Sequence, residues 1–105
     1  MNNGVVPSTV LIVDDVPLNR KLQQTYLDSE GYNVMMASDG LEALEKIKQQ
    51  PPDLVLLDVM MPRMNGFEVC QNLKDDDDTR FIPIILVIRN LNSIIINSSI
   101  IPIIK

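Results

Sequence analysis

The sequence predicts an α/β fold, built as a doubly wound parallel sheet that loses its regular pattern near the C-terminus. Short β-branched runs alternate with segments of helical period from Thr9 to Val87, which is typical of βαβ units. The runs are nearly continuous hydrophobics, as expected for strands that helices cover on both faces. After Val87 the alternation is replaced by a segment rich in Ile, Asn and Ser.

Four runs have the composition of strands. They are residues 9–13 (TVLIV), 33–37 (NVMMA), 53–57 (DLVLL) and 82–87 (IPIILV). Right-handed crossovers place consecutive parallel strands side by side, and in flavodoxin-like folds the strand order reverses next to the first strand. The sequence therefore predicts an incomplete flavodoxin-like sheet of four regular strands, with ligands bound at that reversal.

Three segments between the strands have helical period. The first spans 18–29 and ends before Gly31, which supplies a left-handed stop. The second lies between Gly40 and the Pro51-Pro52 breaker, and the third follows Gly66. The apolar stripes of the three segments are Leu18, Leu22, Tyr26 and Leu27; Leu41, Leu44 and Ile47; and Phe67, Val69, Cys70 and Leu73.

Composition excludes several classes of function. A chain of 105 residues builds one small domain, and with no His and a single Cys it holds neither a Cys/His zinc site nor a His-dependent hydrolase triad. The net charge of −5, with scattered Lys and Arg, argues against a nucleic-acid partner. The N-terminus lacks signal-peptide features, and no apolar run reaches the roughly 18 residues of a membrane span. We therefore expect a cytoplasmic protein without membrane contact.

Three carboxylates follow neighbouring strands. Asp14 and Asp15 end the first strand, and Asp58 ends the third, which lies beside it in the predicted order. We expect them to converge on one pocket, where their mutual repulsion calls for a cation, and hard oxygen ligands suit Mg²⁺. Spacing alone leaves open the alternative that each Asp merely starts a loop or caps a helix.

Four motifs in order carry a family resemblance. They are LIVDD (11–15), DGLEAL (39–44), PDLVLLDVMMPRMNGFEVC (52–70) and IPIILV (82–87). Residues 9 to 87 resemble a receiver domain of bacterial response regulators, the phosphoacceptor module of two-component phosphorelays. We accordingly divide the chain into an N-terminal extension (1–8), a partial receiver domain (9–88) and an atypical tail (89–105).

The resemblance implies a role for individual residues. Asp58 would take a phosphoryl group from a sensor histidine kinase or a phosphotransfer protein. Asp15 would bind Mg²⁺ directly, Asp14 would act through water, and the backbone carbonyl of Met60 would complete the ligands. Gly66 would allow the backbone to turn closely beside the site. The chain would not be an enzyme beyond its own phosphorylation and dephosphorylation.

The sequence departs from the family after the fourth strand. Ile88 stands where similar receivers carry Thr or Ser, and the late cation Lys105 falls short of the usual spacing of the family's lysine. The resemblance then implies impaired switching.

Two alternatives to a phosphoacceptor function remain open. One alternative is a catalytically silent interaction module with a vestigial pocket. A Mg²⁺-dependent phosphatase is a weaker one, since it would be expected to carry a second Asp where Met60 stands.

The tail lacks the design of a folded receiver segment. It holds seven Ile, no acid and no Gly. Because Ile, Asn, Ser and Lys share A/T-rich codons, one hypothesis is that the tail is translated from a shifted reading frame. Because strand four would otherwise be an exposed edge, we expect a makeshift edge strand at 99–104, parallel to 82–87, with 91–96 crossing over the sheet. Weak self-association is a further expectation.

Overall fold

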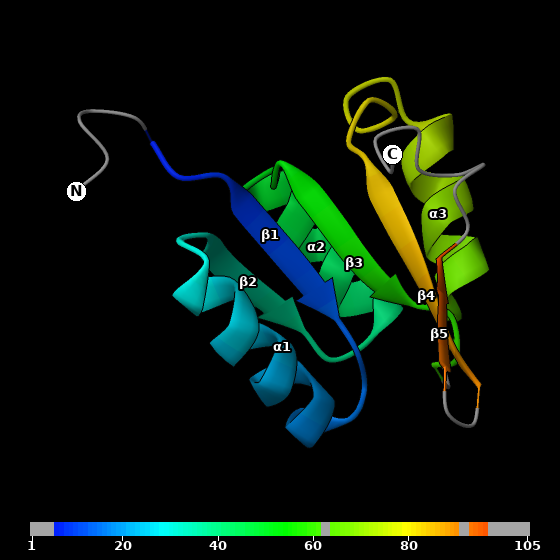
Figure 1. Cartoon of the computed structure of the whole chain (residues 1–105). Coiled ribbons are helices and arrows are strands. Elements are labelled where there is room, and N and C mark those ends of the chain that lie inside the picture. Colours follow the sequence, from blue (N-terminus) through cyan, green and yellow to red (C-terminus); the bar gives the residue numbers. More distant parts are fainter. Residues whose placement is uncertain (1–5, 62–63, 91–92, 97–105) are drawn as a thin grey trace.

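The sheet contains strands β1 (Thr9–Val13), β2 (Asn33–Ala37), β3 (Leu54–Asp58), β4 (Ile84–Asn90) and β5 (Ser93–Ile96), in the order β2-β1-β3-β4-β5 (Figure 1). The structure, a computed structural model, describes residues 6–61, 64–90 and 93–96. Strands β1 to β4 run parallel, and the order reverses beside β1. The predicted doubly wound, flavodoxin-like sheet is confirmed.

Three helices connect the parallel strands in the described residues: α1 (Pro17–Ser29), α2 (Gly40–Gln49) and α3 (Gly66–Asp75). Local chemistry sets where they begin. Pro17 occupies the first turn of α1, the Asp39 side chain accepts the Glu42 N–H at 2.8 Å to cap α2, and Asn65 forms a capping box with Glu68 at α3. Gly31 has φ +90°, as its predicted role as a stop after α1 requires.

The main core lies between the sheet and helices α2 and α3. Side chains from alternate positions of β1 and β3 point to that face because successive strand residues face opposite sides. The cluster includes Leu11, Val13, Val55, Leu57, Ala43, Ile47, Val69, Cys70, Leu73, Ile84 and Leu86. The predicted apolar stripe of the third helix thus packs as expected, except that Phe67 is half exposed.

Helix α1 lies on the opposite face and is covered far less than its sequence predicts. No residue of α1 is buried, and Leu18, Leu22 and Tyr26 are each at least 60% exposed. The helix packs mainly over β2 and β1, in front of the sheet in Figure 1. The expectation that helices cover both faces of every strand is therefore wrong over β3 and β4, where no described helix lies on the α1 side.

The C-terminal strand differs from the expectation. β4 runs on to Asn90, and β5 pairs with it antiparallel, from Val87 opposite Ile96 to Asn90 opposite Ser93. The predicted crossover at 91–96 is wrong: only two residues separate the strands, and a parallel pair needs a connection of about a dozen or more. The edge strand expected at 99–104 lies outside the described residues.

None of the helices in the described ranges is long and apolar enough to cross a membrane.

Candidate metal centre

The register of the parallel strands brings the acidic residues together. Val13 of β1 is paired with Leu57 of β3, so that Asp14 and Asp58 follow at the same level of the sheet. One carboxylate oxygen from each of Asp14, Asp15 and Asp58 lies within 4.8 Å of the other two. The three residues that the sequence singles out thus form one cluster at the carboxyl edge of the sheet.

The buried Asp14 is held by donors from the loop and from α1. It is only 2% exposed, and its Oδ1 accepts the Val16 N–H at 2.9 Å, which closes a tight turn after β1. Its Oδ2 lies 3.5 Å from Nε2 of Gln23, and its backbone carbonyl accepts from the Arg20 guanidinium at 2.7 Å. Side chains of α1 therefore fix the loop that carries Asp14 and Asp15.

Asp58 is equally buried, at 2% exposure, and is held from its own loop. Its Oδ1 accepts the Met60 N–H at 3.0 Å, and the next residue, Val59, donates its N–H to the Val87 carbonyl at 3.2 Å. The backbone of Gly66 approaches this turn so closely that an added Cβ would lie 2.7 Å from Val59 Cα and 2.8 Å from the Asp58 carbonyl oxygen. The predicted need for glycine here is confirmed.

The donor set fits a hard divalent cation. Two carboxylates that are almost fully buried and a third that is half-buried concentrate negative charge in a region of low dielectric, where an opposite charge is strongly favoured. Mg²⁺ prefers oxygen ligands, so the three carboxylates, whose oxygens lie within 4.8 Å of one another, would be suited to hold such an ion.

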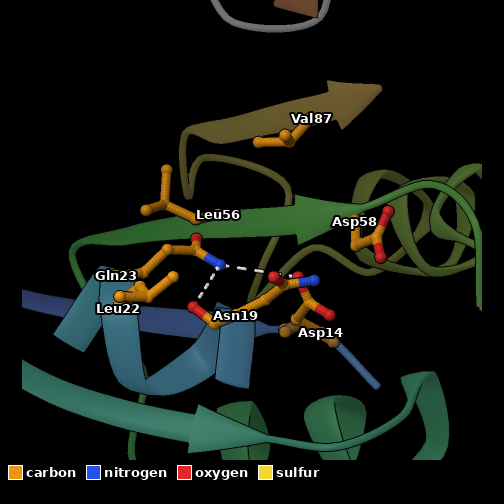
Figure 2. A pocket seen from close by; sticks show the side chains of 8 residues that line it. Asp14, Asn19, Leu22, Gln23, Leu56, Asp58 and Val87 are labelled. Carbon is orange, nitrogen blue, oxygen red and sulfur yellow. Dashed lines mark hydrogen bonds between the residues drawn. The ribbon is translucent and has the colours of Figure 1, made fainter. Parts of the chain in front are cut away.

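A cavity of about 260 Å³ opens beside the cluster on the α1 side of the sheet (Figure 2). Its lining comprises Val13, Asp14, Asn19, Leu22, Gln23, Leu56, Asp58 and Val87. In Figure 2 the Gln23 amide lies between the Asn19 carbonyl, at 3.1 Å, and Asp14. The carboxylates thus stand at one end of an otherwise largely apolar hollow.

Sequence reasoning misses Gln23 and Arg20 as supports of Asp14, because the helical pattern alone does not show that side chains of α1 reach back to the loop after β1. The helical period offers a signal. Asn19 and Gln23 are four residues apart, so they lie on the same face of α1, and this helix follows the acid pair directly in the sequence.

Two further residues that the sequence analysis names, Met60 and Cys70, differ in their exposure to solvent. Met60 has a 68% exposed side chain, and the role of its carbonyl as a ligand stays a prediction. Cys70 is buried in the core, as expected of an inert packing residue, and burial raises the pKa of its thiol.

Comparisons with known proteins agree with this geometry. The family model of the response regulator receiver domain matches residues 10–97 of this chain. The chain is 49% identical over 78 residues to the response regulator PleD of Caulobacter vibrioides, covering 74% of this chain and 17% of PleD. It is 43% identical over 82 residues to the polar-differentiation response regulator DivK of Brucella anthropi, covering 78% of this chain and 67% of DivK.

Solved structures show the same likeness. The N-terminal domain of a response regulator receiver protein from Methanoculleus marisnigri superposes with a TM-score of 0.74 at 43% identity, over 75% of this chain and 64% of that one. The receiver domain of a sensor histidine kinase from Pseudomonas aeruginosa, described with a magnesium ion coordinated in the active site cleft, has a TM-score of 0.73 at 28% identity, over 77% and 66% of the two chains. By fold, acidic cluster and sequence, this chain belongs to the response regulator receiver domain family.

Proposed function

We propose that this chain is a phosphoacceptor of a two-component phosphorelay, with Asp58 as the residue that is phosphorylated. The observation that carries the proposal is the meeting of Asp14, Asp15 and Asp58 within 4.8 Å at adjacent strand ends. A cluster of this kind needs a cation, and a bound cation prepares a carboxylate to meet an anionic phosphoryl group.

The transfer is a substitution at phosphorus. A carboxylate oxygen of Asp58 forms the new P–O bond while the bond from phosphorus to the donor breaks, which is a P–N bond in a phosphohistidine. The leaving imidazole keeps the electron pair of that bond and takes up a proton. The Met60 N–H, 3.0 Å from Asp58 Oδ1, fixes the orientation of the carboxylate beside Asp14 and Asp15.

Asp15 and Asp58 are the residues proposed to hold Mg²⁺ directly, with Asp14 acting through water and the Met60 carbonyl completing the protein ligands. Bound there, Mg²⁺ supplies positive charge that offsets the repulsion between carboxylate and phosphoryl oxygens. The magnesium described in the Pseudomonas aeruginosa receiver domain supports this choice of metal.

The partner proposed is a sensor histidine kinase or a phosphotransfer protein in the cytoplasm. Two of the structural relatives are receiver domains of histidine kinases, and the curated relatives named above are response regulators. Because this chain spans 17% of PleD, any output function of such longer relatives lies outside the proposal.

We propose further that transfer is slow and that switching is impaired. Ile88 follows Val87, the residue paired with Asp58, and it has no hydroxyl to offer a phosphoryl oxygen. Among the described residues, the strand beyond β4 is antiparallel rather than a fifth parallel strand, and Lys105 falls outside them. A phosphoryl group on Asp58 would lack the hydrogen bond from the Thr or Ser that similar receivers carry at the position of Ile88.

The test is labelling of the full chain with radioactive acetyl phosphate in Mg²⁺ or in EDTA, followed by mass spectrometry of the labelled peptide. We expect a slow, Mg²⁺-dependent label on Asp58 that Asp58→Asn abolishes. The control Asp28→Asn, an exposed carboxylate on α1, should leave labelling unchanged. A label elsewhere, or none at saturating donor and Mg²⁺, would refute the proposal and favour a silent interaction module.

A further inference from the structure

Strand β2 is the outermost strand at one edge of the sheet, and no described strand lies beyond it (Figure 1). The Asn33 N–H and the Ala37 carbonyl form hydrogen bonds of 2.9 and 3.1 Å with the residues that flank β1. Alternate residues of a strand direct their backbone groups to the same side. Asn33, Met35 and Ala37 therefore face β1, whereas the N–H and C=O groups of Val34 and Met36 face the outer edge.

The side chain of Lys46, from α2, covers one of these outward groups. Its Nζ donates a hydrogen bond to the Met36 carbonyl and lies 3.2 Å from a carboxylate oxygen of Glu42, one turn earlier on the helix. Glu42 is fixed in turn by the Ser38 backbone N–H at 2.7 Å and by the Ser38 hydroxyl at 2.8 Å. The bound ammonium occupies an acceptor that an added strand would use, and charged side chains at an edge oppose such pairing.

The outward groups of β2 are self-complementary. With a two-fold axis at Met35, Val34 of one copy lies opposite Met36 of the other, and each such pair exchanges both of its N–H···O=C bonds. The strand, NVMMA, carries no charge, so this pairing sets no like charges directly opposite one another.

The edge also has space beside it. A cavity of about 360 Å³ lies there, lined by Met35, Met36, Lys46, Gln49 and Gln50. An extended strand adds to a sheet at a spacing of about 4.8 Å, so its backbone and side chains would enter this space.

We propose that the outer edge of β2 is a strand-pairing surface for a second copy of this chain, and that Lys46 blocks it. While the ammonium is bound to the Met36 carbonyl, the β2 edge remains unpaired. When the ammonium is removed, the two β2 strands pair antiparallel and join the two sheets. The pairing uses none of the residues proposed for phosphorylation, and it therefore holds or fails separately from the role of Asp58.

Sedimentation velocity of the full chain over a range of concentrations tests the blocking role. We expect Lys46→Ala to raise the association constant about tenfold or more, because it frees an acceptor held by a charged donor. Lys48→Ala is the matched control, since it removes the same charge from an exposed position of the same helix. Lys46→Arg, which keeps the charge and the donors, should associate no more than the unmodified chain.

A proline substitution tests whether the β2 edge carries this association. Val34→Pro removes an N–H that faces the outer edge and leaves the ladder with β1 in place. Combined with Lys46→Ala, it should return the chain to the association constant of the unmodified protein. Circular dichroism establishes that each variant is folded, and Lys46→Gln replaces Lys46→Ala if the alanine variant is not.

Disulfide trapping tests the register. In a Lys46→Ala, Cys70→Ser background, Met35→Cys sets two thiols at the two-fold axis, where opposite Cα atoms are about 4.5 Å apart and within disulfide range. Met36→Cys, one residue away, places its thiol off the axis and should form dimers more slowly.

Three outcomes would overturn the proposal. The first is association of Lys46→Ala, or of Lys46→Gln in its place, that is no stronger than that of Lys48→Ala. The second is association that persists when Val34→Pro is added. The third is disulfide formation at Met35→Cys that is no faster than at Met36→Cys.

Discussion

Asp14 and Asp58 stand side by side because the residues that precede them, Val13 and Leu57, are register partners in adjacent parallel strands. Both aspartates are 2% exposed. Asp15 follows Asp14 and contributes a third carboxylate from the loop. The arrangement places negative charge that is costly to bury at a point where a bound cation would offset that cost.

The first prediction concerns metal binding. Asp15→Asn and Asp58→Asn should each weaken Mg²⁺ binding by about tenfold or more, because each removes a full charge from the cluster. Isothermal titration with MgCl₂ measures this, and Asp28→Asn provides the control at an exposed site. Unchanged affinity in both cluster variants would show that no shared site exists.

The second prediction concerns Arg20, whose guanidinium donates to the Asp14 carbonyl at 2.7 Å. Arg20→Ala should loosen the loop that carries the acid pair and lower Mg²⁺ affinity several-fold, although Arg20 is not a ligand. Lys21→Ala, at the next and exposed position, should not. Arg20→Lys should restore part of the Mg²⁺ affinity. If Arg20→Ala and Lys21→Ala lower the Mg²⁺ affinity equally, Arg20 acts only through its positive charge and not through its hydrogen bond to Asp14.

The third prediction compares two glycines. Gly66→Ala should lower the free energy of unfolding by about 1 to 3 kcal/mol, because its Cβ would lie 2.7 Å from Val59 Cα, a backbone atom that cannot move aside cheaply. At Gly31 an added Cβ would meet no atom within 4 Å, so Gly31→Ala costs only the strain of an alanine at a φ of +90°, about 1 kcal/mol. Urea unfolding of both variants checks the order, and a larger loss at Gly31 would contradict it.

The fourth prediction concerns pH. Hydrogen bonds from the Ser38 backbone N–H, and then from its hydroxyl, lower the pKa of Glu42 from 4.5 to about 2, with a smaller contribution from Lys46. A depressed pKa stabilises the fold above pH 4.5, and that stability is lost as pH falls toward 2. Glu42→Gln should flatten the acid dependence of unfolding in this window, whereas Glu45→Gln on the same helix should not. Parallel acid curves for both variants would be inconsistent with this assignment.

The strands and the acidic cluster were predictable because their signals are local. Buried parallel strands are apolar throughout, and each Asp comes directly after such a strand. The supports of the site were harder to predict. Gln23 reaches Asp14 only because α1 crosses in front of β1, which the chain order does not specify.

The expected burial of α1 failed for a related reason. The stripe of Leu18, Leu22 and Tyr26 predicts a buried helix face, but burial depends on what else covers that side of the sheet. In the described residues, α1 packs mainly against β1 and β2. The sequence pattern specifies which side chains are apolar, whereas their burial depends on elements elsewhere in the chain.

The last prediction concerns the C-terminal hairpin. Deleting residues 91–105 removes β5 and leaves β4 as a sheet edge, with backbone N–H and C=O groups open to another chain. We expect a lower melting temperature and concentration-dependent association, measured by calorimetry and by light scattering. Deleting residues 1–5 serves as the control, since it leaves every described strand and helix intact. If the 91–105 deletion melts at the same or a higher temperature and stays monomeric, β5 contributes no stability. Protection of β4 against association would then have to come from its own residues.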